Sequence, residues 1–169
     1  MIVCETERLI IQHLNLDYAD YILKQLNEAS FIQFIADKQV RTIDDAKQYL
    51  LNGPITSYQK LGFGLNLVLL KQTGAPIGMC GILKRDELEY PDIGYAFLPE
   101  FWGKGYAGEA SEAVLINAVD IHKLNTILAV THPNNKASNN LLSRIGFKHT
   151  GSVELYNSNN NLYIYNTNT

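Results

Sequence analysis

Three glycines in the segment Gly103-Lys-Gly-Tyr-Ala-Gly108 lie between a predicted strand, Asp92–Leu98, and a predicted long helix at about Ala107–Asp120. Glycines leave backbone N–H groups unobstructed, and the first N–H groups of a helix have no partner within the helix. Together with the positive end of the helix dipole, such N–H groups favour an anion. The pattern predicts a cradle for a diphosphate, although by spacing alone a simple turn explains the glycines equally well.

Hydrophobic periodicity on both sides of this loop predicts a mixed α/β chain. Strands are predicted at Arg8–His13, Phe63–Lys71, Pro76–Lys84, Asp92–Leu98, Thr126–Thr131, Phe147–Glu154 and, after a polar turn at Asn157–Asn161, Leu162–Tyr165. Helices are predicted at Asp17–Glu28, from the capping-box sequence Thr42-Ile-Asp-Asp45 to Gly53-Pro54, at about Ala107–Asp120, and at about Asn135–Arg144. The early hairpin makes the sheet mostly antiparallel, and two later crossovers add parallel pairing.

Length and charge narrow the classes of protein to consider. A chain of 169 residues without a repeat or linker predicts one domain, residues 1–169. Its 14 Lys and Arg against 17 Asp and Glu, with neither sign in a block, argue against a nucleic-acid partner. No apolar run approaches the ~20 residues that span a bilayer, and the N-terminus lacks a signal pattern. We therefore expect a cytoplasmic protein without a membrane partner.

The cysteines and histidines give no metal-ligand pattern. Cys4 and Cys80 form no CxxC or Cys/His spacing, and the four histidines are spread over separate predicted elements. We predict no metal site, and reduced, buried thiols with Cys80 packed in a strand. Phe101 and Trp102, just before the glycines, are predicted to anchor the loop by burial.

The glycine segment also matches G-x-G-x-x-G, the fingerprint of dinucleotide-binding folds. That fingerprint follows its strand at once and precedes an acidic residue at the end of the next strand, ~20 residues on. Here residues 99–102 intervene, and the next strand ends at Thr131-His132. A nicotinamide-dependent oxidoreductase is an alternative that this context disfavours.

Motifs in a fixed order extend over nearly the whole chain. They are Thr6-Glu-Arg-Leu-Ile, Gly74–Gly81, Ile93-Gly-Tyr, Phe101–Ala110, and Pro133–Ser138 followed by Leu142 and Gly146-Phe147. Together they resemble the GNAT superfamily of acyl-CoA-dependent N-acetyltransferases, in particular its RimJ/RimL-like branch. The resemblance implies a mixed, mostly antiparallel sheet of about seven strands with helices on both faces. The cofactor would enter between the fourth and fifth strands.

Three positions depart from the family pattern. The loop usually starts with Gln or Arg, whereas this chain has Trp102, which the branch tolerates. Gly108 stands where Thr or Ser is frequent, so a hydroxyl contact to phosphate is absent. The acidic residue of the fourth strand, often Glu, is Asp92, one methylene shorter.

The resemblance implies that this chain binds acetyl-CoA without a metal. Backbone N–H groups of the loop would hold the diphosphate, at Gly103, Lys104, Gly105, Ala107 and Gly108. Phe97 and Leu98 would offer strand-edge groups to the pantetheine arm. Pro99 removes a ladder donor and favours separation of that strand from its neighbour.

Asn135 and Ser138 fit two interpretations. From the residues alone they form a helix-capping pair, because they are three positions apart at a helix start. By the resemblance, Asn135 would contact the cofactor arm. Ser138 would lie near the thioester sulfur as a proton donor or thiolate stabiliser.

Amine acceptors require a base, since a primary amine is mostly protonated at neutral pH. Asp92 is the candidate, with Glu89 and Tyr90 as alternatives; a solvated charge at a strand start is the structural reading. We predict direct acetyl transfer to a primary amine in a ternary complex, helped by backbone donors at the developing oxyanion. The acceptor is a protein or peptide N-terminus or a small-molecule amine. A non-catalytic acyl-CoA-binding module remains an alternative, as do monomer and homodimer.

Overall fold

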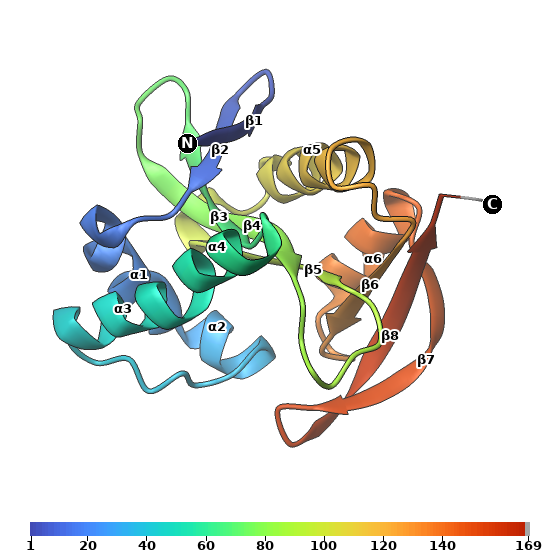
Figure 1. The fold of residues 1–169 in the computed structure, drawn as a ribbon. Coiled ribbons are helices and arrows are strands. Elements are labelled where there is room, and N and C mark those ends of the chain that lie inside the picture. Colours follow the sequence, from blue (N-terminus) through green and yellow to red (C-terminus); the bar gives the residue numbers. More distant parts are fainter. Residues whose placement is uncertain (168–169) are drawn as a thin grey trace.

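One twisted sheet organises the computed structural model, which describes residues 1–167 (Figure 1). Within 1–167 the strand order is β1-β2-β3-β4-β5-β6-β8-β7, and every neighbouring pair is antiparallel except β5 and β6. The bounds are Ile2–Glu5, Leu9–His13, Leu65–Leu70, Pro76–Leu83, Asp92–Phe97, Thr126–Thr131, Lys148–Leu155 and Ser158–Asn166 for β1 to β8. The predicted mixed, mostly antiparallel sheet is confirmed. The strand β1 was not predicted from the hydrophobic pattern.

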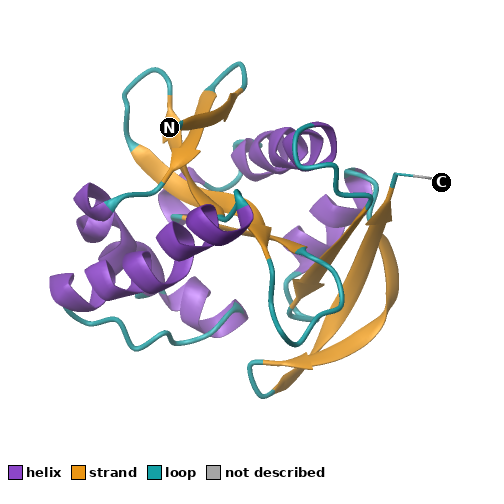
Figure 2. Cartoon of the chain, in the orientation of Figure 1, coloured by secondary structure: helices purple, strands orange, loops and turns teal. Residues whose placement is uncertain are grey.

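Helices cover both faces of the sheet (Figure 2). On one face lie α1 (Ala19–Leu26), α2 (Ala29–Phe34), α3 (Ile43–Leu50) and α4 (Thr56–Leu61), and on the other α5 (Tyr106–Asp120) and α6 (Lys136–Arg144). Because successive side chains of β3 point to opposite faces of the sheet, the strand contributes to both cores. Leu67 packs beneath α1 and α3, and Val68 packs beneath α5. The capping box predicted at Thr42 is present, with Asp45 bonded back to it.

The second predicted helix does not end at Gly53-Pro54. A π-helical turn, Leu51–Ile55, carries the chain from α3 into α4, and Pro54 is buried inside it. In a regular α-helix a proline lacks one N–H and its ring clashes with the carbonyl four residues earlier, and the helix departs from α geometry where Pro54 stands. The Thr56 hydroxyl donates to the Leu51 carbonyl at 2.6 Å. The helical segment ends instead at Gly62, whose φ is 81°.

The polar C-terminal segment is a strand for most of its length. The predicted turn at Asn157–Asn161 is confined to Tyr156 and Asn157, whose φ angles are 55° and 59°. Two positive φ values fit the tight hairpin turns that match strand twist. β8 starts at Ser158 because it lies between β6 and β7, where ladder hydrogen bonds on both edges outweigh its low apolar content.

Candidate functional site

The two parallel strands of the sheet separate soon after they meet. β5 and β6 pair only at Asp92 with Leu128 and at Ile93 with Ala129, while β6 continues to pair along β8. The Leu98 amide donates to the Ile77 carbonyl at 2.9 Å, on the β4 side. Backbone groups alternate between the two edges of a strand, so the N–H groups of Tyr95 and Phe97 face the gap. The separation predicted for these strands is confirmed.

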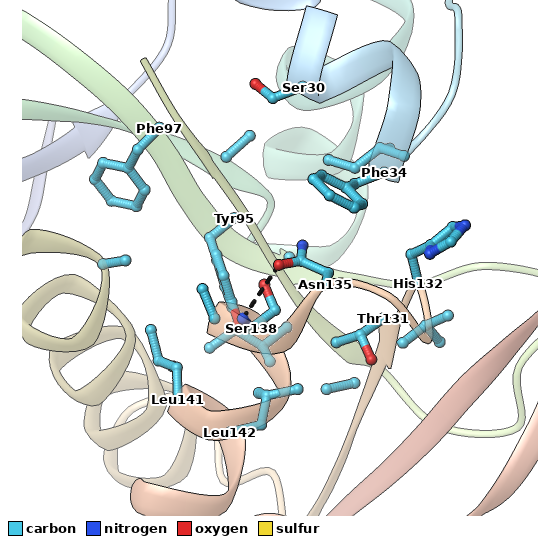
Figure 3. Close-up of a pocket in the computed structure, with 18 of the residues that line it drawn as sticks. Ser30, Phe34, Tyr95, Phe97, Thr131, His132, Asn135, Ser138, Leu141 and Leu142 are labelled. Atoms are coloured by element: carbon cyan, nitrogen blue, oxygen red, sulfur yellow. Dashed lines mark hydrogen bonds between the residues drawn. The ribbon is translucent and has the colours of Figure 1, made fainter. Parts of the chain in front are cut away.

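A cleft of about 670 Å³ occupies this gap. It is lined by α2, β5, the glycine loop, β6, the start of α6 and the β7–β8 turn. Figure 3 shows the lining residues of α2, β5, β6 and α6. Ile93 and Phe97 belong to the core beneath α5, and Ala96 to the core beneath α1 and α3. Because side chains alternate along a strand, Asp92 faces α1–α3 and Tyr95 faces α5 and α6. The cleft therefore joins the two faces of the sheet.

The glycine loop leads directly into α5. Gly103 and Gly105 have φ angles of 75° and 83°, which a glycine adopts without strain. Gly105 is the N-cap of α5, and no side chain caps the helix. Its first N–H groups therefore lack a side-chain acceptor, which is the arrangement that binds anions. A Cβ at Gly108 would stand 3.3 Å from Nη2 of Arg144, a cation that the sequence reasoning missed.

A brace of three residues, Thr6, Arg8 and Glu109, holds the glycine loop against the N-terminal strands. Glu109 Oε2 accepts from Thr6 Oγ1 at 2.5 Å, and Glu109 Oε1 accepts from Arg8 Nε at 2.7 Å. Arg8 Nη1 donates to the Lys104 carbonyl at 2.9 Å, and its guanidinium lies 4.4 Å from the Tyr106 ring centroid. In a trans peptide the C=O and the next N–H point in opposite directions. The bond to Lys104 therefore turns the Gly105 N–H away from Arg8.

Ser138 lies on the first turn of α6, beside the phenol of Tyr95 (Figure 3). The Asn135 side chain accepts from the Ser138 backbone N–H at 3.3 Å, so the capping interpretation of this pair is confirmed. The Tyr95 hydroxyl oxygen is buried and has no hydrogen-bond partner among residues 1–167. Burial raises the pKa of Tyr95 to about 12.

Asp92 is buried rather than solvated, with 1% of its side chain exposed. Arg85 Nε donates to its two carboxylate oxygens at 3.0 and 3.2 Å, and Arg85 Nη1 donates to the Tyr156 hydroxyl. Burial raises the pKa of Asp92, and the Arg85 guanidinium opposes that effect. The carboxyl group thus lines the cleft and has a raised proton affinity, the combination expected of a general base.

Comparisons with known proteins decide the family. A family model described as an acetyltransferase (GNAT) domain matches residues 8–148. This chain belongs to the GNAT acetyltransferases. The N-acetyltransferase YoaA of Bacillus subtilis is 26% identical to it over 156 residues, 91% of this chain and 87% of that protein. YkkB of the same organism is 32% identical over 100 residues, 57% of this chain and 58% of that protein.

The fold of this GNAT chain is also that of a solved RimL. The structure of RimL, a ribosomal L7/L12 α-N-protein acetyltransferase in complex with coenzyme A, superimposes with a TM-score of 0.83. The superposition covers 98% of each chain, at 16% sequence identity. The predicted GNAT fold is confirmed, and RimL is one of the solved structures that share it.

Most of the sequence-predicted site residues line the cleft of this GNAT protein. Those that do so are Asp92, Phe97, Gly103, Gly105, Ala107, Gly108, Asn135 and Ser138. Leu98 and Lys104 do not: the Leu98 amide bonds to β4, and the Lys104 carbonyl bonds to Arg8. Sequence reasoning missed Arg8, Arg85, Glu109 and Tyr156, because pairings across the fold leave no local pattern. It also missed Tyr95 and Arg144, which line the cleft.

Trp102 and Cys80 test two further predictions about burial. Trp102 is 52% exposed, so the prediction that it anchors the loop by burial is wrong. Its indole N–H instead donates to the Phe97 carbonyl at 2.9 Å, which fixes the ring without burying it. Cys80 is fully buried, as predicted, and burial raises the pKa of its thiol to about 12, so it is not a reactive thiolate at neutral pH.

Residues 1–167 contain neither a membrane-spanning helix nor a cluster of metal ligands. None of the helices has the length and apolar content needed to cross a bilayer. In the same range, no group of three or more His, Cys, Asp or Glu side chains is placed to hold a metal ion.

Proposed function

We propose that this chain transfers the acetyl group of acetyl-CoA to a primary amine by direct attack in a ternary complex. The observation that carries the proposal is the separation of β5 from β6 beside the uncapped, glycine-bordered start of α5. This arrangement supports an anion at one end of the cleft and free strand N–H groups at its centre.

The residues at the loop fit a CoA diphosphate. The first N–H groups of α5 lack side-chain acceptors, and a Cβ at Gly108 would crowd Arg144. Phosphate oxygens would accept hydrogen bonds from those N–H groups, and Arg144 lies near enough to add a positive charge. Asn135, which lines the cleft at the start of α6, would contact the cofactor arm. When bound, acetyl-CoA supplies an activated acyl group and a thiolate leaving group.

Three groups of this chain would serve the transfer. The N–H groups of Tyr95 and Phe97 face the gap and would stabilise negative charge on the acyl oxygen. Ser138, with the Tyr95 hydroxyl beside it, would donate a proton toward the sulfur. Asp92, on the opposite face of the cleft, would receive the proton of the amine, directly or through water.

The brace of Thr6, Arg8 and Glu109 gives a prediction about cofactor affinity. Replacing Arg8 with methionine leaves the Glu109 carboxylate without its cation in the first turn of α5 and frees the Lys104 carbonyl. We expect the KM for acetyl-CoA to rise about tenfold with kcat within twofold, because the loop N–H groups lose their orientation and the diphosphate meets an unpaired charge. Steady-state kinetics measure the split.

The double variant R8M/E109Q separates charge from structure. If the unpaired charge of Glu109 causes the loss, R8M/E109Q binds acetyl-CoA more tightly than R8M. If the brace acts only through structure, the double variant binds acetyl-CoA no more tightly than R8M. The matched control is Lys24→Met, which breaks an exposed ion pair with Glu100 (2.7 Å) and is expected to leave the KM unchanged. An unaltered KM in R8M would dismiss the brace.

The buried carboxyl of Asp92 gives a prediction about pH. A base works only when ionised, so its raised pKa places the loss of activity above the ordinary carboxyl range as pH falls. Below the pKa of the amine, log(kcat/KM) falls with a slope of one per pH unit, and protonation of Asp92 increases that slope to two. Asp92→Asn should keep the slope at one and lower kcat/KM about 100-fold. Identical profiles for the two proteins would remove Asp92 as the base.

Turnover separates the enzyme from a binding module. The purified protein is incubated with acetyl-CoA and a panel of peptide N-termini and small amines, with free thiol as the first readout and mass of the acetylated amine as the second. An amine-dependent release of thiol, matched by product, supports the proposal. Acetyl-CoA binding without turnover of any amine supports the acyl-CoA-binding module instead.

A further inference from the structure

The acceptor end of the cleft contains a guanidinium with unused bonding capacity. We propose that this end binds a small amine that carries a carboxylate, and that Arg85 holds the carboxylate; the inference rests on the proposed acetyltransferase function. The acceptor class would then be amino acids rather than the N-termini of folded proteins.

Arg85 lines the cleft and has one terminal nitrogen, Nη2, without an acceptor among residues 1–167. Arg85 Nε donates to Asp92 and Nη1 donates to Tyr156. The side chain is only 21% exposed and lines the cleft. A guanidinium N–H that is largely removed from water gains most from a charged acceptor, and a carboxylate matches its planar donors best.

The ion pair offers two opposite charges to one ligand. Asp92 and Arg85 both line the cleft, with Arg85 Nε 3.0 Å from the Asp92 carboxylate. A ligand with an ammonium and a carboxylate can meet both, the ammonium on the Asp92 side and the carboxylate at Arg85 Nη2. An amine without an anionic group leaves that donor unpaired. The pair therefore favours an acceptor that is itself zwitterionic.

Three connecting segments meet on Tyr156 at this end of the cleft. Tyr156 forms the β7–β8 turn, Arg85 comes from the β4–β5 connection, and Lys38 comes from the segment between α2 and α3. The Lys38 ammonium lies 4.6 Å from the Tyr156 ring centroid, and Arg85 Cζ lies 5.5 Å from it. These contacts hold the three segments together beside Arg85, an arrangement that suits a small acceptor better than a polypeptide.

The helix α2 and its C-cap residue add three apolar side chains to the lining of the cleft, beside Ser30. Phe31, Phe34 and Ile35 line the cleft there, and Phe34 also meets the His132 ring edge-on at 5.7 Å between centroids. These side chains would pack against an apolar or aromatic side chain of the ligand. Phenylalanine and leucine are therefore suitable first probes, with matched compounds that lack the carboxylate.

The test compares each acid with its neutral analogue. Initial rates are measured with acetyl-CoA for phenylalanine, phenylalaninamide and phenethylamine, and for ω-amino acids of increasing chain length, which report the distance between Arg85 and the reacting amine. We expect kcat/KM for the best acid to exceed that of its amide by about 10- to 100-fold. In Arg85→Met this preference should disappear while the acetyl-CoA dissociation constant stays within twofold.

Arg41→Met is the matched control, because Arg41 pairs with Asp37 and does not line the cleft; it should retain the preference. Arg85→Lys should retain part of it. Amides or peptide N-termini that react as well as the acids would overturn the inference and leave the acetyltransferase function standing. If acetyl-CoA binds but no amine in the panel is acetylated, the proposed function fails and the inference with it. Should R85M not fold, the acid and amide rates of the wild-type protein still decide.

Discussion

Gly105→Val is expected to weaken acetyl-CoA binding by about 100-fold or more, while the protein remains folded. Gly105 has φ of 83°, where a β-branched residue is strained, and its Cβ would stand 3.4 Å from Arg8 Nη2. Relief of that strain moves the loop N–H groups out of the orientation that an anion needs. Isothermal calorimetry with acetyl-CoA measures the loss.

Gly74→Val is the matched control for backbone strain. Gly74 has φ of 74° in the β3–β4 turn, and a Cβ there would meet no atom within 4 Å. Thermal unfolding should show similar destabilisation in both variants, whereas only Gly105→Val should lose affinity for acetyl-CoA. Wild-type affinity in Gly105→Val would mean that the glycine loop is a turn and not the diphosphate site.

Ser138→Ala is expected to lower kcat by about 100-fold, in the range for loss of a proton-transfer group, with the KM for acetyl-CoA within twofold. The substitution spares the helix cap, because Asn135 accepts from the Ser138 backbone and not from its hydroxyl. Stability should therefore change little. Single-turnover measurement of acetyl transfer isolates the chemical step.

Two further variants bracket this result. Ser143→Ala removes an exposed hydroxyl from the same helix and should leave kcat unchanged, whereas Ser138→Thr should restore part of the rate. Full kcat in Ser138→Ala would assign Ser138 a capping role alone. The Tyr95 hydroxyl, buried beside Ser138 without a partner, would then be the proton donor to examine.

The sequence predicted the elements whose signals are local. Strands β2 to β6 follow apolar runs, and α5 and α6 follow glycine and Asn135 start signals, so their predicted bounds differ from the observed ones by no more than two residues. Pro54 and β8 were misread because their environment overrides local preference. A π-helical turn accommodates the proline, and two flanking strands accommodate the asparagines.

The candidate site divides in the same way. The glycine loop, Asp92, Asn135 and Ser138 could be found because each belongs to a motif or marks the start of an element. The residues that contact them in the folded protein could not be found from the sequence. Arg8 reaches Glu109 across 101 positions of the chain, and Arg85 reaches Tyr156 across 71, so only the folded topology brings them together.

The most direct test of this account is calorimetric titration of the purified chain with acetyl-CoA, without added metal and with NAD and NADP as controls. We expect micromolar binding of acetyl-CoA with one site per chain, no binding of either nicotinamide cofactor, and loss of the signal in Gly105→Val. Binding of NAD or NADP in place of acetyl-CoA would contradict the assignment of the cleft. Acetyl-CoA affinity that Gly105→Val leaves unchanged would place the cofactor away from the glycine loop.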